Sequence, residues 1–192
     1  MTIQIRQVTN DDWEQVKYIY EAGIATKLAT FETQVPTFYE QWISNANLAC
    51  TLVAVEGNEI KGWCKLNPVS ARKVYAGVGE VSIYVHPEAT GQGIGHLLMQ
   101  HMIQKSEEEG YWTLESKIFV ENHASIQLHK KNGFRAVGIR EKIAMLDGEW
   151  KCTECGYVSK ITDAEYESEE RYQFEKNRTN EVVISHNDIS QD

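Results

Sequence analysis

The sequence predicts an α+β fold with strand–helix–strand crossovers in the middle of the chain. Strand-like runs at residues 79–85 and 112–119 are each followed by a segment with apolar residues at helical spacing. Gly57-Asn58 and Asp147-Gly148 each join two strand-like runs, which is typical of β-hairpins. The 192 residues, 42% of them hydrophobic, suit one domain with a short extension.

The first part of the chain predicts two helices among strands. Apolar and polar residues alternate at 2–8, which indicates a strand, and a helix is expected at 9–24, where Thr9 or Asn10 can cap it. A short helix is expected at 37–46, and two strands make a hairpin at 51–66. The apolar residues of the first helix share one face: Trp13, Val16, Ile19 and Tyr20.

The second part predicts two crossovers and a hairpin. The strand at 79–85 leads through three glycines into a helix that starts at Ile94 and fades into 105–110. A strand at 112–119 precedes a helix within 121–134, with Asn122 as a cap and Gly133 as a terminator. The final hairpin is expected to pair 136–146 with 149–161.

The last segment of the chain differs in composition. Residues 161–192 hold nine acidic side chains against Arg171, Lys176 and Arg178, so they carry −6 of the net charge of −9. A solvated accessory tail is the simplest interpretation of such a segment. We therefore expect a domain at 1–160 and an acidic C-terminal extension at 161–192.

Composition excludes several classes of protein. A net charge of −9 disfavours a nucleic-acid partner, because phosphate neutralisation requires clustered Lys and Arg. The N-terminus lacks the apolar core of a signal peptide, and no run approaches the roughly 18 apolar residues of a membrane span. Four cysteines do not make a dense disulfide scaffold. We expect a cytoplasmic protein that does not bind membranes.

The glycine-rich joint at 91–95 predicts a phosphate-binding turn. Glycines between a strand and a helix let successive N–H groups point into one concavity, and the helix N-terminus adds unpaired donors. A tight turn that serves packing alone is the alternative. His96-Leu97 excludes a P-loop, which needs Lys-Ser/Thr after its last glycine, and Gly-x-Gly-x-Gly departs from the dinucleotide fingerprint.

Tyr84-Val85-His86-Pro87, followed by 91–95, resembles the acetyl-CoA-binding segment of the Gcn5-related N-acetyltransferase (GNAT) family. Gly93 and Gly95 match the family's Gln/Arg-x-x-Gly-x-Gly/Ala pattern, whereas Thr90 stands where Gln or Arg is usual and removes one side-chain contact. The segment 121–134 resembles the family's Asn-x-x-Ser…Gly-Phe segment. Over about residues 3–151 the chain is similar to the phosphinothricin and methionine sulfoximine acetyltransferase branch.

The resemblance implies a mixed, mostly antiparallel twisted sheet, splayed between the parallel strands at 80–85 and 112–119 and flanked by helices on both faces. It also implies acetyl-CoA as co-substrate, with its pantetheine arm in the splay and its diphosphate on main-chain amides. Asn122 has a plain helix cap as its alternative role. The implied cofactor-binding residues are Ile83, Tyr84, Val85, Gly91, Gln92, Gly93, Ile94, Gly95, His96, Asn122 and Ser125.

The resemblance further implies two catalytic residues. Glu80 matches the branch's base, which must remove a proton before the amine can attack, and burial among apolar residues would favour proton exchange near neutral pH. An ordinary exposed glutamate is the alternative. His129 is expected to protonate the departing CoA thiolate, with a packing histidine as the alternative. No Ser-His-Asp or Cys-His order emerges, so direct attack in a ternary complex is expected.

The expected acceptor is the primary amine of a small amino-acid-like compound. In the branch, the segments with Phe31, Glu32, Arg72 and Tyr75 flank the acceptor pocket, and an arginine such as Arg72 can clamp a carboxylate. A solvated loop charge is its alternative. A peptide or protein N-terminus, and a non-catalytic acyl-CoA-binding module, remain alternative functions. The branch also implies a homodimer.

Cys152-x-x-Cys155 is half of a zinc-ribbon signature. It supplies two ligands where a structural zinc site wants four, so no metal is expected. A second chain or His186 could complete a site, and a redox role is a further alternative. Cys50 and Cys64 lie in predicted strands and are interpreted as core residues.

Overall fold

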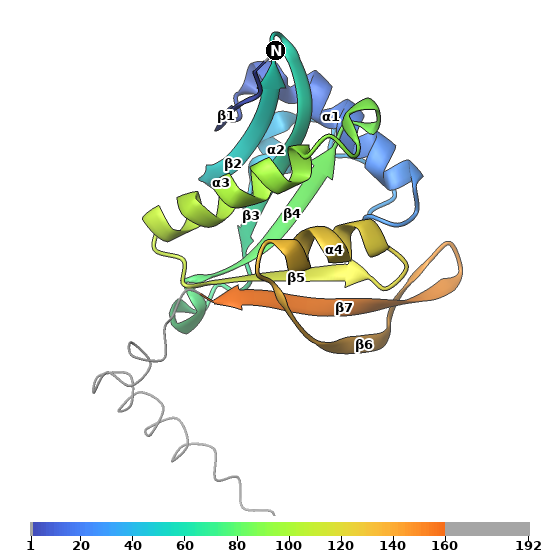
Figure 1. Cartoon of the computed structure of the whole chain (residues 1–192). Helices are drawn as coiled ribbons and strands as arrows, with labels where there is room; N and C mark the ends of the chain where they lie inside the picture. Colours follow the sequence, from blue (N-terminus) through green and yellow to red (C-terminus); the bar gives the residue numbers. More distant parts are fainter. Residues whose placement is uncertain (1, 160–192) are drawn as a thin grey trace, which may run out of the picture. The chain divides into compact units, whose positions relative to one another are not determined.

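The computed structural model describes residues 2–159 (Figure 1). One mixed sheet has the strand order β1-β2-β3-β4-β5-β7-β6, in which β4 and β5 are parallel and the other neighbours are antiparallel. The predicted α+β fold with a parallel pair is therefore confirmed. The strands are β1 (Gln4–Gln7), β2 (Asn47–Glu56), β3 (Glu59–Pro68), β4 (Val78–Val85), β5 (Thr113–Phe119), β6 (Arg135–Leu146) and β7 (Glu149–Ser159).

Helices cover both faces of the sheet (Figure 1). One face carries α1 (Trp13–Ala25) and α2 (Tyr39–Ile43). The other carries α3 (Ile94–Glu108), beside which lies α4 (His123–Lys131). These helices lie where apolar spacing predicted them. None of the helices within 2–159 is long and apolar enough to cross a membrane.

Alternation along the strands divides the core into two layers. Leu52 and Ala54 of β2 face α3, whereas Val53 between them faces α1. On the α1 side, Trp42 and Trp63 are buried and their rings meet edge to face, 5.1 Å apart. Successive side chains of a strand point to opposite faces of the sheet, so a central strand such as β2 contributes to both layers.

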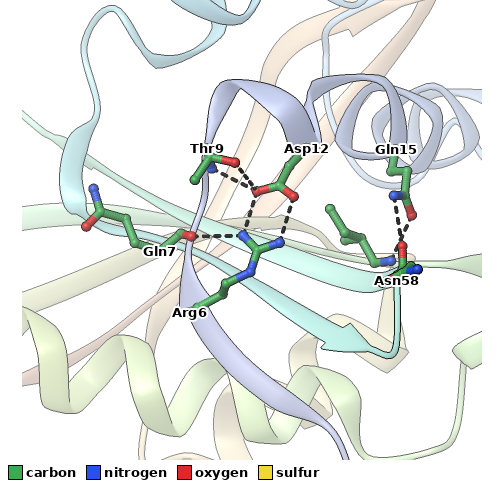
Figure 2. A network of polar contacts seen from close by, with 7 residues as sticks. Arg6, Gln7, Thr9, Asp12, Gln15 and Asn58 are labelled. Atoms are coloured by element: carbon green, nitrogen blue, oxygen red, sulfur yellow. Dashed lines mark hydrogen bonds and ion pairs between the residues drawn. The ribbon is translucent and has the colours of Figure 1, made fainter.

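The first helix begins later than predicted, because residues 10–12 form a 3₁₀ turn ahead of it. Asp12 accepts hydrogen bonds from Thr9 N at 2.8 Å and from both terminal nitrogens of Arg6 at 2.6 and 2.8 Å (Figure 2). Gln15 joins α1 to the β2–β3 hairpin through Asn58 O and Ile60 N. The pair with Arg6 lowers the pKa of the Asp12 carboxyl below its usual range, although burial opposes this.

The two parallel strands separate after three residues. The β4–β5 register runs Val78–Thr113, Gly79–Leu114 and Glu80–Glu115 and ends there. Beyond Glu80, β5 continues on β7, and β4 continues on β3. The sheet is therefore splayed next to Glu80, and this divergence creates the space described below.

The last strand continues through the cysteine motif. β7 runs from Glu149 to Ser159, so both Cys152 and Cys155 lie within this strand. It pairs with β5 from Thr153 to Ser159. Side chains three positions apart in a strand point to opposite faces, so these thiols are poorly placed to bind one ion. Within the part of the chain that the structure describes, no three His, Cys, Asp or Glu residues gather as metal ligands. The predicted extension at 161–192, with His186, lies outside the described residues.

Candidate active site

A cavity of about 580 Å³ occupies the space between the diverging strands. Its walls come from β4 and β5, its floor extends onto β3, and the segment after α1 and the start of α4 complete it. Glu80 lies where the strands part. The predicted site residues that line this cavity are Phe31, Glu32, Glu80, Ile83, Tyr84, Val85, Asn122, Ser125 and His129.

Glu80 does not have the apolar surroundings that the sequence led us to expect. Its carboxylate forms an ion pair with Lys117, which also lies 3.1 Å from Glu115 Oε1. The side chain of Glu80 is 36% exposed, so water reaches it. The ion pair with Lys117 holds the Glu80 carboxylate at the point where the strands part, where a general base could reach a ligand in the cavity.

His129 is buried in α4, and its imidazole contacts the main chain of the same helix. Burial lowers the pKa of its imidazole, although a hydrogen bond to the Ser125 carbonyl opposes this. Nδ1 lies 2.8 Å from Ser125 O, an acceptor, so Nδ1 carries the hydrogen. Nε2 has no partner among the described residues. In the neutral ring Nε2 then lacks a hydrogen, so donating a proton to a thiolate would require the imidazolium.

The glycine turn gives the α3 N-terminus an open set of donors. Gly91 and Gly93 adopt left-handed φ angles of +78° and +83°, and Gly93 caps α3. The first α3 amide bonded to a main-chain carbonyl is Leu97 N, 3.0 Å from Gly93 O. The three preceding helical amides, 94–96, therefore have no intrahelical acceptor, as a diphosphate site requires.

Gln92 and Gly95, which the resemblance assigned to the cofactor, also have structural roles in this turn. Gln92 N donates to Ala89 O at 3.3 Å, so this amide is engaged within the turn, and Gln92 Nε2 donates to Glu88 O at 2.8 Å. A Cβ on Gly95 would approach Leu128 Cδ2 to 3.0 Å. Gly95 therefore permits α3 to lie close to α4, a role that local sequence does not reveal.

Asn122 caps α4 and also holds the loop over the cavity. Its Oδ1 accepts from Ser125 N at 3.1 Å, and its Nδ2 donates to Leu28 O at 3.0 Å. Phe31, three residues further along this loop, meets Phe119 of β5 edge to face at 4.6 Å. Asn122 thus positions one wall of the cavity, and a cofactor contact would share an amide that already makes these two bonds.

The predicted acceptor residues separate into two groups. Phe31 and Glu32 line the cavity. Arg72 and Tyr75 are exposed on the segment before β4 and are not among the lining residues of this chain. The Arg72 guanidinium lies over the Tyr75 ring at 5.6 Å. Two lysines line the cavity instead, Lys65 and Lys117.

Sequence reasoning did not single out the polar floor of the cavity. Lys65, Asn67, Ser82 and Lys117 all line it, from three adjacent strands. Alternation in the sequence could show that Lys65 and Asn67 share a face with Trp63. Only the pairing of β3 with β4 places that face beside Glu80.

A splayed mixed sheet, a carboxylate at the splay and open amides at the following helix define an acyl-CoA-dependent transferase. The chain belongs to the acetyltransferase (GNAT) family, whose sequence profile matches residues 7–134. This confirms the predicted family and the class of enzyme, an acetyl-CoA-dependent N-acetyltransferase.

Relatives with named activities come from the predicted branch. The chain is 26% identical over 155 residues to a phosphinothricin N-acetyltransferase of Streptomyces coelicolor, covering 77% of this chain and 91% of that protein. It is 28% identical over 155 residues to an L-methionine sulfoximine/L-methionine sulfone acetyltransferase of Pseudomonas aeruginosa, covering 78% and 90%.

Two solved structures share the fold over most of their length. The acetyltransferase yncA of Salmonella typhimurium, solved with its cofactor acetyl-CoA, superposes with a TM-score of 0.78 at 21% identity, covering 84% of this chain and 96% of that one. A ribosomal-protein-alanine N-acetyltransferase of Brucella melitensis superposes with a TM-score of 0.76 at 26% identity, covering 81% and 99%.

Proposed function

We propose that this enzyme transfers acetyl from acetyl-CoA to the primary amine of a small amino-acid-like acceptor, such as methionine sulfone or phosphinothricin. The observation that carries the proposal is the position of Glu80 at the divergence of β4 and β5, facing the 580 Å³ cavity. The activities of the branch relatives support the choice of acceptor.

In this proposal the splay holds the coenzyme. Past Glu80, β4 has no β5 neighbour, so main-chain groups of residues 83–85 can pair with the pantetheine amides. The amides at the α3 N-terminus bind the diphosphate without a cationic side chain. The thioester then reaches the point where the strands part, beside Glu80.

The chemistry proceeds by direct attack. Glu80 accepts a proton from the acceptor's ammonium, directly or through water, and the freed nitrogen attacks the thioester carbonyl carbon. A main-chain N–H near Tyr84 stabilises the negative charge on the carbonyl oxygen. The nitrogen of the adduct then loses its second proton to water, the carbon–sulfur bond breaks, and CoA leaves as a thiolate. That thiolate takes up one proton, from His129 when its ring is an imidazolium and from water otherwise.

Glu80→Gln tests the role of Glu80. We expect kcat to fall by at least about 100-fold, the effect of losing a general base, while the Kd for acetyl-CoA stays within about twofold. Glu115→Gln is the matched control, since Glu115 shares Lys117 but does not line the cavity. An unchanged kcat in Glu80→Gln would remove Glu80 from the mechanism.

A peptide N-terminus is a second candidate acceptor, because of the similarity to the ribosomal-protein-alanine N-acetyltransferase. CoA release should be measured with methionine sulfone, phosphinothricin and alanine-initiated peptides. Faster turnover of the small acceptors supports the first proposal, and faster turnover of the peptides supports the second. Tight binding of acetyl-CoA with no turnover of any amine would favour a non-catalytic module.

A homodimer and a cytoplasmic location complete the proposal. The β6–β7 hairpin exposes apolar side chains that a second copy could cover: Val137, Ile139, Met145 and Trp150 are 51–61% exposed. Light scattering on the purified protein would give its mass in solution. A monomer at all concentrations would exclude the dimer.

A further inference from the structure

Lys65 is a cation without a counter-ion on the floor of the cavity. It lies on β3 and is half-buried, and no ion pair within 2–159 includes it. Its Nζ donates one hydrogen bond, to Trp42 O at 2.9 Å, and lies 5.1 Å from the centre of that Trp42 ring. An ammonium has three donors, so two remain for a ligand.

The charge of Lys65 is incompletely compensated. Burial lowers the pKa of the Lys65 ammonium to about 8, and the more distant Glu32 carboxylate only partly opposes this. The other lysine on the cavity wall, Lys117, already pairs with Glu80 and Glu115. A partly desolvated cation next to a binding cavity is stabilised by an anion that enters it.

Asn67 supplies a second unsatisfied group on the same face of β3. Asn67 lines the cavity, and its Oδ1 is buried and has no hydrogen-bond partner within the described residues. Buried polar atoms of this kind usually have partners, so an orphan at a cavity wall points to a ligand group. In the β3–β4 register, Asn67 lies opposite Glu80 and Lys65 opposite Ser82.

These two positions match the two ends of an α-amino acid. Residues 65 and 67 are two apart in a strand, so their Cα atoms lie about 6.6 Å from each other on one face. Both side chains line the same cavity, so one small ligand that carries an amine and a carboxylate can contact both. The amine end falls on the Glu80 side, where deprotonation must occur.

We propose that Lys65 and Asn67 form the acceptor subsite: the Lys65 ammonium binds the acceptor's α-carboxylate, and Asn67 Oδ1 accepts a hydrogen bond from its amine beside Glu80. The proposal rests on the proposed function and adds to it the two residues that select an α-amino acid with a free carboxylate. It assigns to Lys65 the carboxylate contact that the sequence assigned to Arg72.

A purely structural role for Lys65 is the competing explanation. Its bond to Trp42 O joins α2 to β3, and this contact would stabilise the fold without any ligand. Under that explanation, Lys65→Met would lower the melting temperature but leave the choice of acceptor unchanged. Acceptor preference therefore separates the two roles.

The experiment compares L-methionine sulfone with its primary carboxamide, which keeps the amine and lacks the negative charge. The wild-type enzyme should prefer the acid, and Lys65→Met should reduce kcat/KM for the acid about 30-fold, the value of one charge-assisted hydrogen bond, while changing the amide less than about threefold. Lys65→Arg should keep most of the preference. Lys61→Met, on the same strand but outside the cavity, is the matched control.

Asn67→Leu tests the second contact. It should lower kcat for the acid and the amide equally, because both acceptors carry the amine. Calorimetric binding of the acid to the CoA-bound enzyme gives a readout without turnover. Binding that depends on Lys65 without any acetylation would support the subsite and refute the proposed function. Acetylation with an unchanged acid-to-amide ratio in Lys65→Met, or no binding or acetylation of the acid, would overturn the subsite.

Discussion

Lys117 of β5 pairs with Glu80 of β4 across the point where these two strands part. The same ammonium lies 3.1 Å from Glu115, which is the register partner of Glu80. One cation therefore serves two carboxylates on adjacent parallel strands. This arrangement fixes the Glu80 carboxylate at the closed end of the splay, where its side chain is 36% exposed.

Removing this cation should slow the reaction. In Lys117→Met, Glu80 and Glu115 lack the ammonium that contacts both of them, and their mutual repulsion displaces the Glu80 carboxylate from its position at the splay. We expect kcat at pH 7 to fall roughly tenfold, or about 1.4 kcal/mol. Steady-state kinetics would measure this, and Lys117→Met/Glu115→Gln should recover part of the loss. Full activity in the single variant would show that the pair is dispensable.

Asp12 should stabilise the fold at neutral pH and lose this effect in acid. Asp12→Asn removes the charge that Arg6 and Thr9 contact, so the free energy of unfolding at pH 7 should fall by about 2 kcal/mol. The folded pKa of Asp12 is lowered, so its contribution is present above the unfolded pKa of about 3.9 and disappears as pH falls through the folded value.

Urea unfolding at pH 7 and at pH 3 would show whether the wild type and Asp12→Asn converge in acid. Asp11→Asn is the control, since Asp11 is exposed and should change stability by less than about 0.5 kcal/mol. A constant difference at both pH values would contradict the assignment.

The buried His129 should make the fold sensitive to mild acid. Its folded pKa lies below the unfolded value of about 6.5, so the unfolded chain binds more protons as pH falls below that value. The free energy of unfolding should therefore decrease between pH 7 and pH 5. His129→Gln keeps a donor for Ser125 O but does not titrate, so it should reduce this slope.

His101 offers a matched comparison for His129. Its Nδ1 lies 2.9 Å from Leu97 O, four residues earlier, as His129 contacts Ser125 O, but His101 is exposed. His101→Gln is the control for loss of such a main-chain contact at an exposed site, measured in the same unfolding series. Equal slopes for the wild type and His129→Gln would contradict the neutral, buried assignment.

Gly93 should tolerate asparagine better than alanine. Its φ of +83° is left-handed, and a Cβ there would meet no atom within 4 Å, so backbone strain alone decides the outcome. Gly93→Ala should lower the free energy of unfolding by about 1 kcal/mol, and Gly93→Asn by less, because asparagine visits this region more readily. Thermal unfolding with and without acetyl-CoA would measure both; equal losses would contradict the strain argument.

The sequence alone determined the elements and the location of the glycine turn before α3. Hairpins at Gly57-Asn58 and Asp147-Gly148, the α1 and α3 stripes and the glycine joint depend on neighbouring residues and on periods of two or 3.6. The resemblance placed Glu80 at the start of β4. The extent of the domain to residue 160 and the acidic extension beyond it stay predictions.

Only the tertiary structure decided how the cavity is lined and charged. Lys65 and Asn67 lie on the strand next to Glu80 because β3 pairs with β4. Lys117 lies on its other side because β5 also pairs with β4. Burial lowers the pKa of the His129 imidazole, and Arg72 lies away from the cavity on an exposed turn. Strand order and burial arise from contacts between residues far apart in the chain, and local spacing does not encode those contacts.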